Sequence, residues 1–154
     1  MKKLGIVLGV CVVLIVLFYA VIHVVNDQIA EGLEDKLLNC PLPPNSEMIE
    51  SVSIAGKKQG NGNGMQYFGI ILIRSEMNKD ELSQWYNSRV DTEENDLIYV
   101  MKQESPEIFK YGNYRFKHYS GENDLYQVCY FRNITAGPGS SSRESLLNID
   151  LRGH

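Results

Sequence analysis

The stretch Met65–Arg74, MQYFGIILIR, carries most of the information about the fold. Its apolar side chains fall on both faces of an extended chain. They are Tyr67, Ile71 and Ile73 on one face and Phe68, Ile70 and Leu72 on the other. A strand that is apolar on both faces is buried on both sides, which places it in the middle of a sheet. Gly69 interrupts the run and predicts either a bulge or the close approach of another backbone segment.

The residues on the N-terminal side of this run predict a partner strand. Residues 48–58 alternate between apolar and polar side chains, as a half-buried strand does. The segment Gly60–Gly64, GNGNG, lies between the two strands and favours a tight turn. An anion-binding loop is the alternative, but the Lys and the Ser or Thr of a phosphate loop do not follow the glycines.

A short helix is predicted over Lys79–Arg89. Asn78 precedes it, and Glu81 follows three residues later, which is the spacing of a capping box. Leu82, Trp85 and Tyr86 share one face, so the helix is expected to lie on the sheet with Trp85 pointing inward.

The rest of the chain predicts further strands and a mostly antiparallel sheet. The expected strands are residues 97–103, 114–119, 125–132 and 146–151. Turn residues at 121–124 predict a hairpin between the second and third of these. Because a helix connects residues 65–74 to residues 97–103, that pair of strands could be parallel. The predicted fold class is α+β: an N-terminal transmembrane helix, then a small, mostly antiparallel sheet with one helix packed on one face.

The N-terminal run Leu4–Val25, LGIVLGVCVVLIVLFYAVIHVV, predicts a transmembrane helix. His23 is its only ionisable side chain apart from Cys11 and Tyr19, and 22 residues of helix span about 33 Å, enough for a hydrocarbon core of about 30 Å. The apolar region of a cleaved signal peptide is shorter, so an uncleaved signal anchor is expected.

Charge on either side of this helix predicts its orientation. Lys2 and Lys3 precede it, and acidic residues dominate the segment that follows. Basic residues stay in the cytoplasm, so a single-pass protein with its domain outside the plasma membrane is expected. The predicted division is a cytoplasmic stub (1–3), a transmembrane helix (4–25), a stalk with a proline-rich linker (26–44) and an extracytoplasmic domain (45–154) that folds by itself.

The charge balance restricts the partners. The chain carries 15 basic and 19 acidic residues, and without Lys2 and Lys3 there remain 13 basic and 19 acidic residues, a net charge of −6. Such a domain is a poor nucleic-acid binder, because phosphate backbones are bound by clustered Lys and Arg. The expected partners are the lipid bilayer and a protein or a glycan.

The block GNGNGMQYFGIILIRSEM, Gly60–Met77, together with the preceding PLPPNSEMIESVS, resembles small membrane-anchored proteins of Gram-positive bacteria whose function is unassigned. The resemblance covers about half of the predicted domain. It implies a bacterial, cell-surface setting and supplies neither an activity nor site residues.

The sequence predicts no catalytic, metal-binding or cofactor-binding set. His118 is expected alone on a strand, and a general base needs a nucleophile beside it. The acidic segment 91–96, DTEEND, lacks the glycine of a calcium loop and is interpreted as a solvated loop.

Aromatic residues provide the one candidate binding surface. Tyr114, Phe116 and His118 are expected to share a face of one strand, and Tyr126 and Tyr130 a face of its partner. Exposed tyrosines on a sheet suit glycan or protein binding, although cross-strand aromatic pairs also stabilise sheets.

Two cysteines lie outside the membrane segment. Cys40 and Cys129 form an even pair in a compartment that permits disulfides, so one bridge between them is an alternative to two free thiols. A packed free thiol at Cys129 is favoured, because this residue falls within a predicted strand.

Three functions are compatible with these features. The first is a membrane-tethered interaction or ligand-binding module on the outer face of the membrane. The others are a small cell-envelope hydrolase and an accessory subunit of a larger membrane complex, whose close helix contacts Gly5 and Gly9 would permit.

Overall fold

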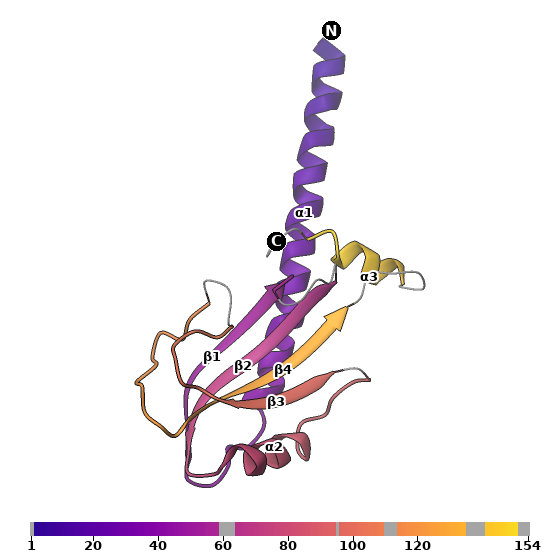
Figure 1. Cartoon of the computed structure of the whole chain (residues 1–154). Coiled ribbons are helices and arrows are strands. Elements are labelled where there is room, and N and C mark those ends of the chain that lie inside the picture. Colours follow the sequence, from indigo (N-terminus) through magenta and orange to yellow (C-terminus); the bar gives the residue numbers. More distant parts are fainter. Residues whose placement is uncertain (1, 59–63, 95, 110–113, 135–140, 151–154) are drawn as a thin grey trace.

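A computed structural model describes residues 2–58, 64–94, 96–109, 114–134 and 141–150 (Figure 1). Most of the glycine-rich segment 60–64 therefore lies outside the described residues. The helices and strands are α1 (Lys2–Leu38), β1 (Ser46–Gly56), β2 (Met65–Ser75), α2 (Lys79–Asn87), β3 (Leu97–Lys102), β4 (Leu125–Ile134) and α3 (Ser142–Leu147).

The four strands form one antiparallel sheet in the order β1-β2-β4-β3. β2 is paired on both sides and nine of its residues in succession are buried, as its two apolar faces predicted. The predicted α+β class is confirmed. β3 runs parallel to β2 but does not pair with it, because β4 lies between them.

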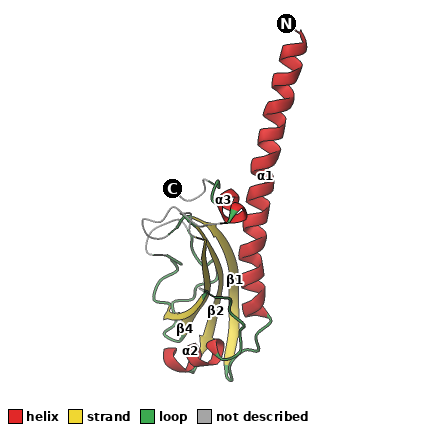
Figure 2. Cartoon of the chain, turned by 90° about the vertical axis from the view of Figure 1, so that its right-hand side faces the viewer, coloured by secondary structure: helices red, strands yellow, loops and turns green. Residues whose placement is uncertain are grey.

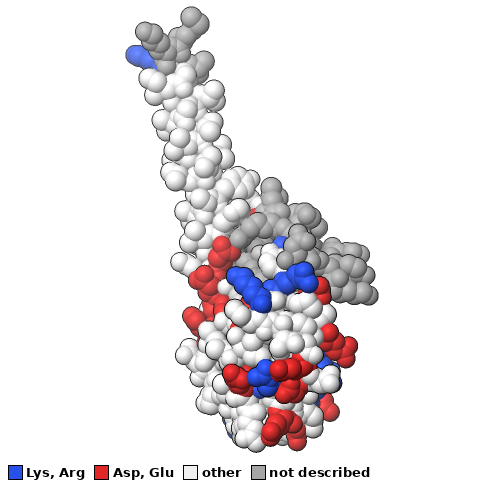
Figure 3. All heavy atoms as spheres, turned by 90° about the vertical axis from the view of Figure 1, so that its left-hand side faces the viewer, with Lys and Arg blue, Asp and Glu red and all other residues white. Residues whose placement is uncertain are grey.

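Helix α1 has two halves with different surroundings. Its N-terminal half projects beyond the sheet, and every side chain from Val12 to Tyr19 is exposed, so apolar groups surround the helix on all sides (Figures 1 and 3). Among the described helices, α1 alone is long and apolar enough to cross a membrane.

The C-terminal half of α1 belongs to the core of the domain. Asn26, Ala30, Leu33 and Leu37 are buried at spacings of four, three and four residues, which places them on one face of the helix. This face packs on the sheet (Figure 2). The predicted stalk is therefore wrong for residues 26–38: the helix does continue, but it continues as a layer of the domain.

Gly69 lies where α1 crosses β2. A Cβ atom at Gly69 would lie 2.2 Å from the backbone nitrogen of Glu34 and 2.4 Å from the carbonyl carbon of Leu33. The strand pairs without a register shift at this residue. Of the two alternatives from the sequence, the close backbone approach is confirmed, and the approaching segment is the helix that was predicted to be a stalk.

Helix α2 packs on the same face of the sheet as α1 and begins with the predicted cap. The Asn78 side chain accepts hydrogen bonds from the backbone N–H groups of Asp80 and Glu81, and the Glu81 carboxylate accepts one from Asn78. The prediction that Trp85 points inward is wrong in one respect: Tyr86 and Leu82 are fully buried, whereas Trp85 is half-buried at the edge of the core.

The second face of the sheet is covered by the irregular segment between β3 and β4. Ile108, Phe109 and Phe116 of this segment pack on Phe68 and Ile70. The predicted strand over residues 114–119 is wrong, because its described backbone makes one isolated bridge, between Arg115 and Glu107. The aromatic side chains of this segment pack on the second face of the sheet, and its backbone does not add a strand at the edge.

The C-terminal segment contains helix α3 over Ser142–Leu147, and none of the described residues 146–150 of the strand predicted over residues 146–151 is in a strand; residue 151 lies outside the described residues. Ser141 accepts a hydrogen bond from Glu144 N–H, and the Glu144 carboxylate accepts one from Ser141 N–H, which completes a capping box. Helix α3 docks on α1 through the buried Asn26, whose amide donates to the Leu147 carbonyl at 3.2 Å and to Asp150 at 2.9 Å.

Candidate functional site

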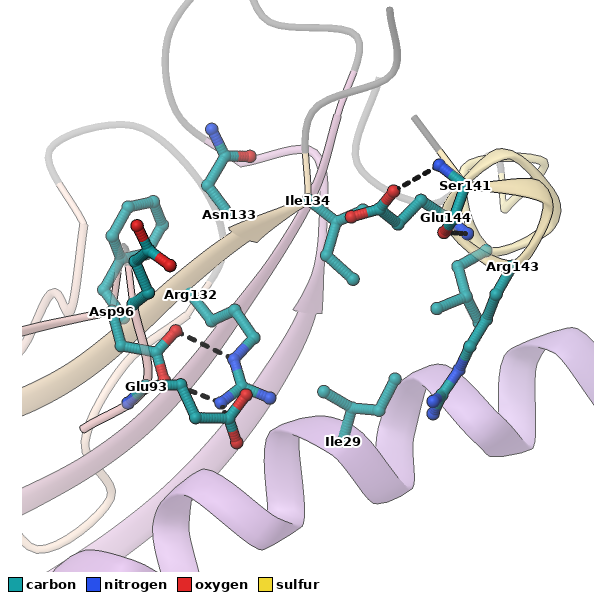
Figure 4. A pocket seen from close by; sticks show the side chains of 12 residues that line it. Ile29, Glu93, Asp96, Arg132, Asn133, Ile134, Ser141, Arg143 and Glu144 are labelled. Carbon is teal, nitrogen blue, oxygen red and sulfur yellow. Dashed lines mark hydrogen bonds and ion pairs between the residues drawn. The ribbon is translucent and has the colours of Figure 1, made fainter. Parts of the chain in front are cut away.

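A groove of about 730 Å³ lies between the end of β4, α3 and the middle of α1 (Figure 4). It is lined by apolar side chains and by charges of both signs. The apolar lining residues are Ile29, Phe131, Ile134 and Leu147, and the charged ones are Glu93, Glu94, Asp96, Arg132, Arg143 and Glu144.

Arg132 is the central cation of this groove. Its Nε donates to Asp96 Oδ1 at 2.8 Å and its terminal nitrogen to Asp96 Oδ2 at 2.6 Å, so the pair is bidentate. The same terminal nitrogen lies 2.7 Å from Glu93 Oε1. The Asp96 side chain is only 2% exposed and that of Arg132 is 21% exposed, so water screens this pair poorly.

The Arg132 pair extends to α1 through Tyr130. The Tyr130 hydroxyl donates to Asp96 Oδ2 at 2.8 Å and accepts a hydrogen bond from the Lys36 ammonium at 3.3 Å. Lys36 also lies 3.8 Å from Glu93 Oε1. Two cations and two carboxylates therefore neutralise one another within a single network that joins α1, β4 and the segment before β3.

The network shifts the pKa values of its members. Burial alone raises the pKa of Asp96, but the hydrogen bonds from Arg132 and Tyr130 outweigh it, so the pKa lies below its ordinary value. Burial and the hydrogen bond to Asp96 raise the pKa of Tyr130 to about 12. Asp96 is thus ionised and Tyr130 neutral. In these states Tyr130 can donate to Asp96 and accept from Lys36 of α1, which links the helix to the sheet.

Replacing Asp96 by Asn should lower the free energy of unfolding by about 2–4 kcal/mol at neutral pH, because Arg132 stays largely buried without its bidentate partner. The folded pKa of Asp96 lies below the unfolded value of about 3.9. Its contribution is therefore present above that pH and is lost as the pH falls through the folded pKa.

The measurement is urea denaturation of the detergent-solubilised protein at several pH values. The parent should lose more stability than Asp96→Asn between about pH 5 and pH 3. Glu94→Gln is the matched control, because Glu94 lines the same groove, is exposed and forms no ion pair in the described part of the chain. Identical pH profiles of the parent and Asp96→Asn would contradict this role.

The structure does not bring the predicted aromatic surface together. Tyr130 is fully buried toward α1, and Tyr126 packs at the edge of the same layer. Phe116 is buried on the opposite face of the sheet, and Tyr114 packs beside it. Of these five side chains, only that of His118 is well exposed, at 69%. Its Nδ1 lies 3.3 Å from Glu50 Oε2. The prediction of one aromatic binding surface is wrong, because residues 114–119 fold over the sheet.

Cys40 and Cys129 are free thiols on opposite faces of the sheet. Cys40 packs with the residues under α1, and Cys129 packs with those under the segment between β3 and β4. The alternative of a disulfide is therefore wrong, and the packed thiol expected at Cys129 is confirmed. Burial raises the pKa of Cys129 to about 12, which keeps this thiol protonated and unreactive.

Asp96 and Arg132 are the residues that sequence reasoning missed. Asp96 was interpreted as part of a solvated loop, and no sequence pattern singled out Arg132. They are 36 positions apart, and neither local periodicity nor a motif links them. No group of three or more His, Cys, Asp or Glu side chains in the described part of the chain is arranged to hold a metal ion.

A second, smaller groove of about 240 Å³ lies on α2, at the end of the domain farthest from the projecting half of α1 (Figures 1 and 2). The Trp85 indole N–H donates to the Pro41 carbonyl at 3.0 Å. The Arg89 guanidinium lies over the Trp85 ring, 3.6 Å from its centroid. No described carboxylate forms an ion pair with Arg89, whereas Arg132 pairs with Glu93 and Asp96.

Comparison of the chain with protein families, with curated proteins and with solved structures found no match.

Proposed function

We propose that the chain is a membrane-tethered interaction module, held on the outer face of the plasma membrane by its own transmembrane helix. The observation that carries the proposal is the continuity of α1, whose first half is bare and apolar and whose second half is a layer of the domain core. No described break or loop separates the two halves, so the domain and the helix move together.

This continuity determines how the domain would sit on a bilayer. A span over Leu4–Val25 measures about 33 Å. The first helix residue buried by the domain is Ile22, so the domain would lie directly on the membrane surface. Helix α3 would then lie near the lipid headgroups and α2 at the membrane-distal tip (Figure 1). A protein that only needed an anchor could use a flexible linker, whereas a fixed orientation favours presentation of one surface to a partner.

Two features support the outward orientation. Lys2 and Lys3 precede the apolar half of α1, and basic residues flanking a span stay in the cytoplasm. The resemblance to small membrane-anchored proteins of Gram-positive bacteria agrees with a cell-surface setting. The domain itself is acidic, which disfavours nucleic acid as the partner.

Cysteine labelling of protoplasts tests the orientation. Glu104→Cys places a thiol on an exposed residue of the domain, and a cysteine inserted between Met1 and Lys2 reports on the other end. A membrane-impermeant maleimide should label Glu104→Cys in intact protoplasts and the inserted cysteine only after lysis. The reverse pattern would overturn the proposed topology. The parent is the control, because Cys40 and Cys129 are buried and Cys11 lies in the apolar half of α1.

No described feature specifically favours either of the two other functions. A hydrolase needs a nucleophile beside a base, and among the described residues His23 and His118 each contact a carboxylate, Asp150 and Glu50. An accessory subunit would use the projecting half of α1, where Gly5 and Gly9 have open space around them. Open space alone does not distinguish a protein neighbour from lipid.

A further inference from the structure

We propose that the groove around Trp85 and Arg89 on α2 binds a polypeptide segment that presents one carboxylate beside an apolar side chain. This inference rests on the proposed function, since it names the surface and the partner of the interaction module. The site lies at the end of the domain that the proposed topology points away from the membrane (Figures 1 and 2).

Trp85 is held as a rigid platform. Its indole N–H is engaged by Pro41, and its ring packs on the edge of the core beneath α1 and α2. A half-buried aromatic ring that is fixed in the free protein loses little entropy when a partner covers it. Tryptophan and arginine are also the residues most enriched at the centres of protein interfaces.

Arg89 supplies the unneutralised charge. Its guanidinium donates to the Trp85 carbonyl at 3.3 Å and to the Ser88 hydroxyl at 2.9 Å, which orients it over the ring. No described carboxylate forms an ion pair with it, whereas Arg74, Arg115 and Arg132 each pair with one or more. The donors of Arg89 that remain free can meet a carboxylate in the planar geometry that a guanidinium prefers.

The apolar surroundings indicate the rest of the ligand. Met77 lines the groove with Trp85, so the surface beside the ring is apolar. An apolar side chain of the partner would cover this surface while its carboxylate reaches Arg89.

The neighbouring charges favour a peptide over a polyanion. Glu81 lines the same groove, and Glu76 and Asp80 lie close to it in the sequence. A polymer of phosphates would meet one cation and several carboxylates, whose repulsion opposes binding. A single carboxylate next to an apolar group avoids most of that repulsion.

The test is a selection of displayed random peptides against the full-length protein in nanodiscs of zwitterionic lipid, with empty nanodiscs as background. Enriched peptides should carry Asp, Glu or a free C-terminal carboxylate beside an apolar residue. Trp85 is the only tryptophan in the chain, so its fluorescence reports binding at this groove directly. The peptides should shift this fluorescence, and replacing their carboxylate by an amide should weaken binding about tenfold or more.

Variants of the protein complete the test. Arg89→Gln should weaken binding about tenfold or more, and Arg89→Lys should restore only part of it because lysine lacks the planar fork. Arg143→Gln is the matched control, since Arg143 is an exposed arginine without a described ion pair at the other end of the domain. Circular dichroism verifies that each variant is folded.

Three results would overturn the inference: no enrichment over empty nanodiscs, peptides that bind Arg89→Gln as tightly as the parent, or long-chain polyphosphate that binds more tightly than any peptide. Nanodiscs expose both sides of the bilayer, so this assay does not depend on topology. A failed maleimide experiment with retained peptide binding would therefore refute the orientation and leave the site intact.

Discussion

A chain that begins at Asn45 should fail to fold cooperatively, whereas one that begins at Ile22 should fold. The shorter chain lacks all of α1, whose buried face includes Leu33 and Leu37. Each leucine contributes about 2–3 kcal/mol when fully buried, and the sheet face beneath them would be exposed to water as well. The combined loss is comparable with the whole stability of a small domain, about 5–15 kcal/mol. This expectation reverses the one from the sequence, where residues 45–154 were the folding unit.

Urea denaturation followed by circular dichroism, together with binding of a dye for exposed apolar surface, makes the comparison. The Ile22–His154 chain should show one sigmoidal transition and little dye binding. The Asn45–His154 chain should show a shallow or absent transition and strong dye binding, or should aggregate. A third chain that begins at Asn26 keeps the polar contacts of Asn26 and isolates the contribution of residues 22–25. A cooperative transition of similar midpoint in the shortest chain would show that α1 is dispensable.

Replacing Gly69 by Ala should destabilise the protein by about 3 kcal/mol or more. Overpacking in a core costs about 1–3 kcal/mol when side chains can shift. Here the added methyl group would lie 2.2 Å from the backbone nitrogen of Glu34, and backbone atoms of a helix cannot move aside as a side chain can. The helix must lift from β2, which also separates Leu33 from the sheet.

Gly32→Ala is the matched control for this substitution. Gly32 lies on α1 itself, close to the contact, but nothing is within 4 Å of the position of its Cβ. Alanine favours a helix by about 1 kcal/mol over glycine, so this variant should equal or exceed the parent in stability. If both variants denature at the same urea concentration as the parent, α1 and β2 do not approach as closely as described.

The local elements were predictable where one segment carried its own signal. The buried strand β2 was visible because its apolar residues occupy both faces, and the start of α2 because Asn78 and Glu81 form a capping box. The same chemistry was present at Ser141 and Glu144, where it begins α3. Only the alternation over residues 146–151 was considered there, and the prediction of a strand was wrong. A capping box specifies hydrogen bonds, whereas alternation over six residues also occurs by chance.

The candidate sites were much less predictable. Tyr126 and Tyr130 are separated from Tyr114 and Phe116 by the sheet itself, which no pairing rule for adjacent strands reveals. Asp96 becomes a buried anion only because Arg132 and Tyr130 lie beside it in the folded chain. Trp85 and Arg89 are four residues apart at the C-terminal end of α2, but the hydrogen bond of Trp85 to Pro41 requires the segment after α1 to pass beside α2.

The sequence by itself determined the apolar N-terminal helix, the central strand and the α+β class, because each follows from side chains that are close in the chain. Only the tertiary structure decided that α1 is a layer of the domain. The pattern of Asn26, Ala30, Leu33 and Leu37 gives a buried face to a helix but does not say what covers it. Gly69 shows that something approaches a strand but does not identify it. The two signals are about 40 residues apart in the sequence. Only the folded chain shows that the buried face of the helix packs on Gly69.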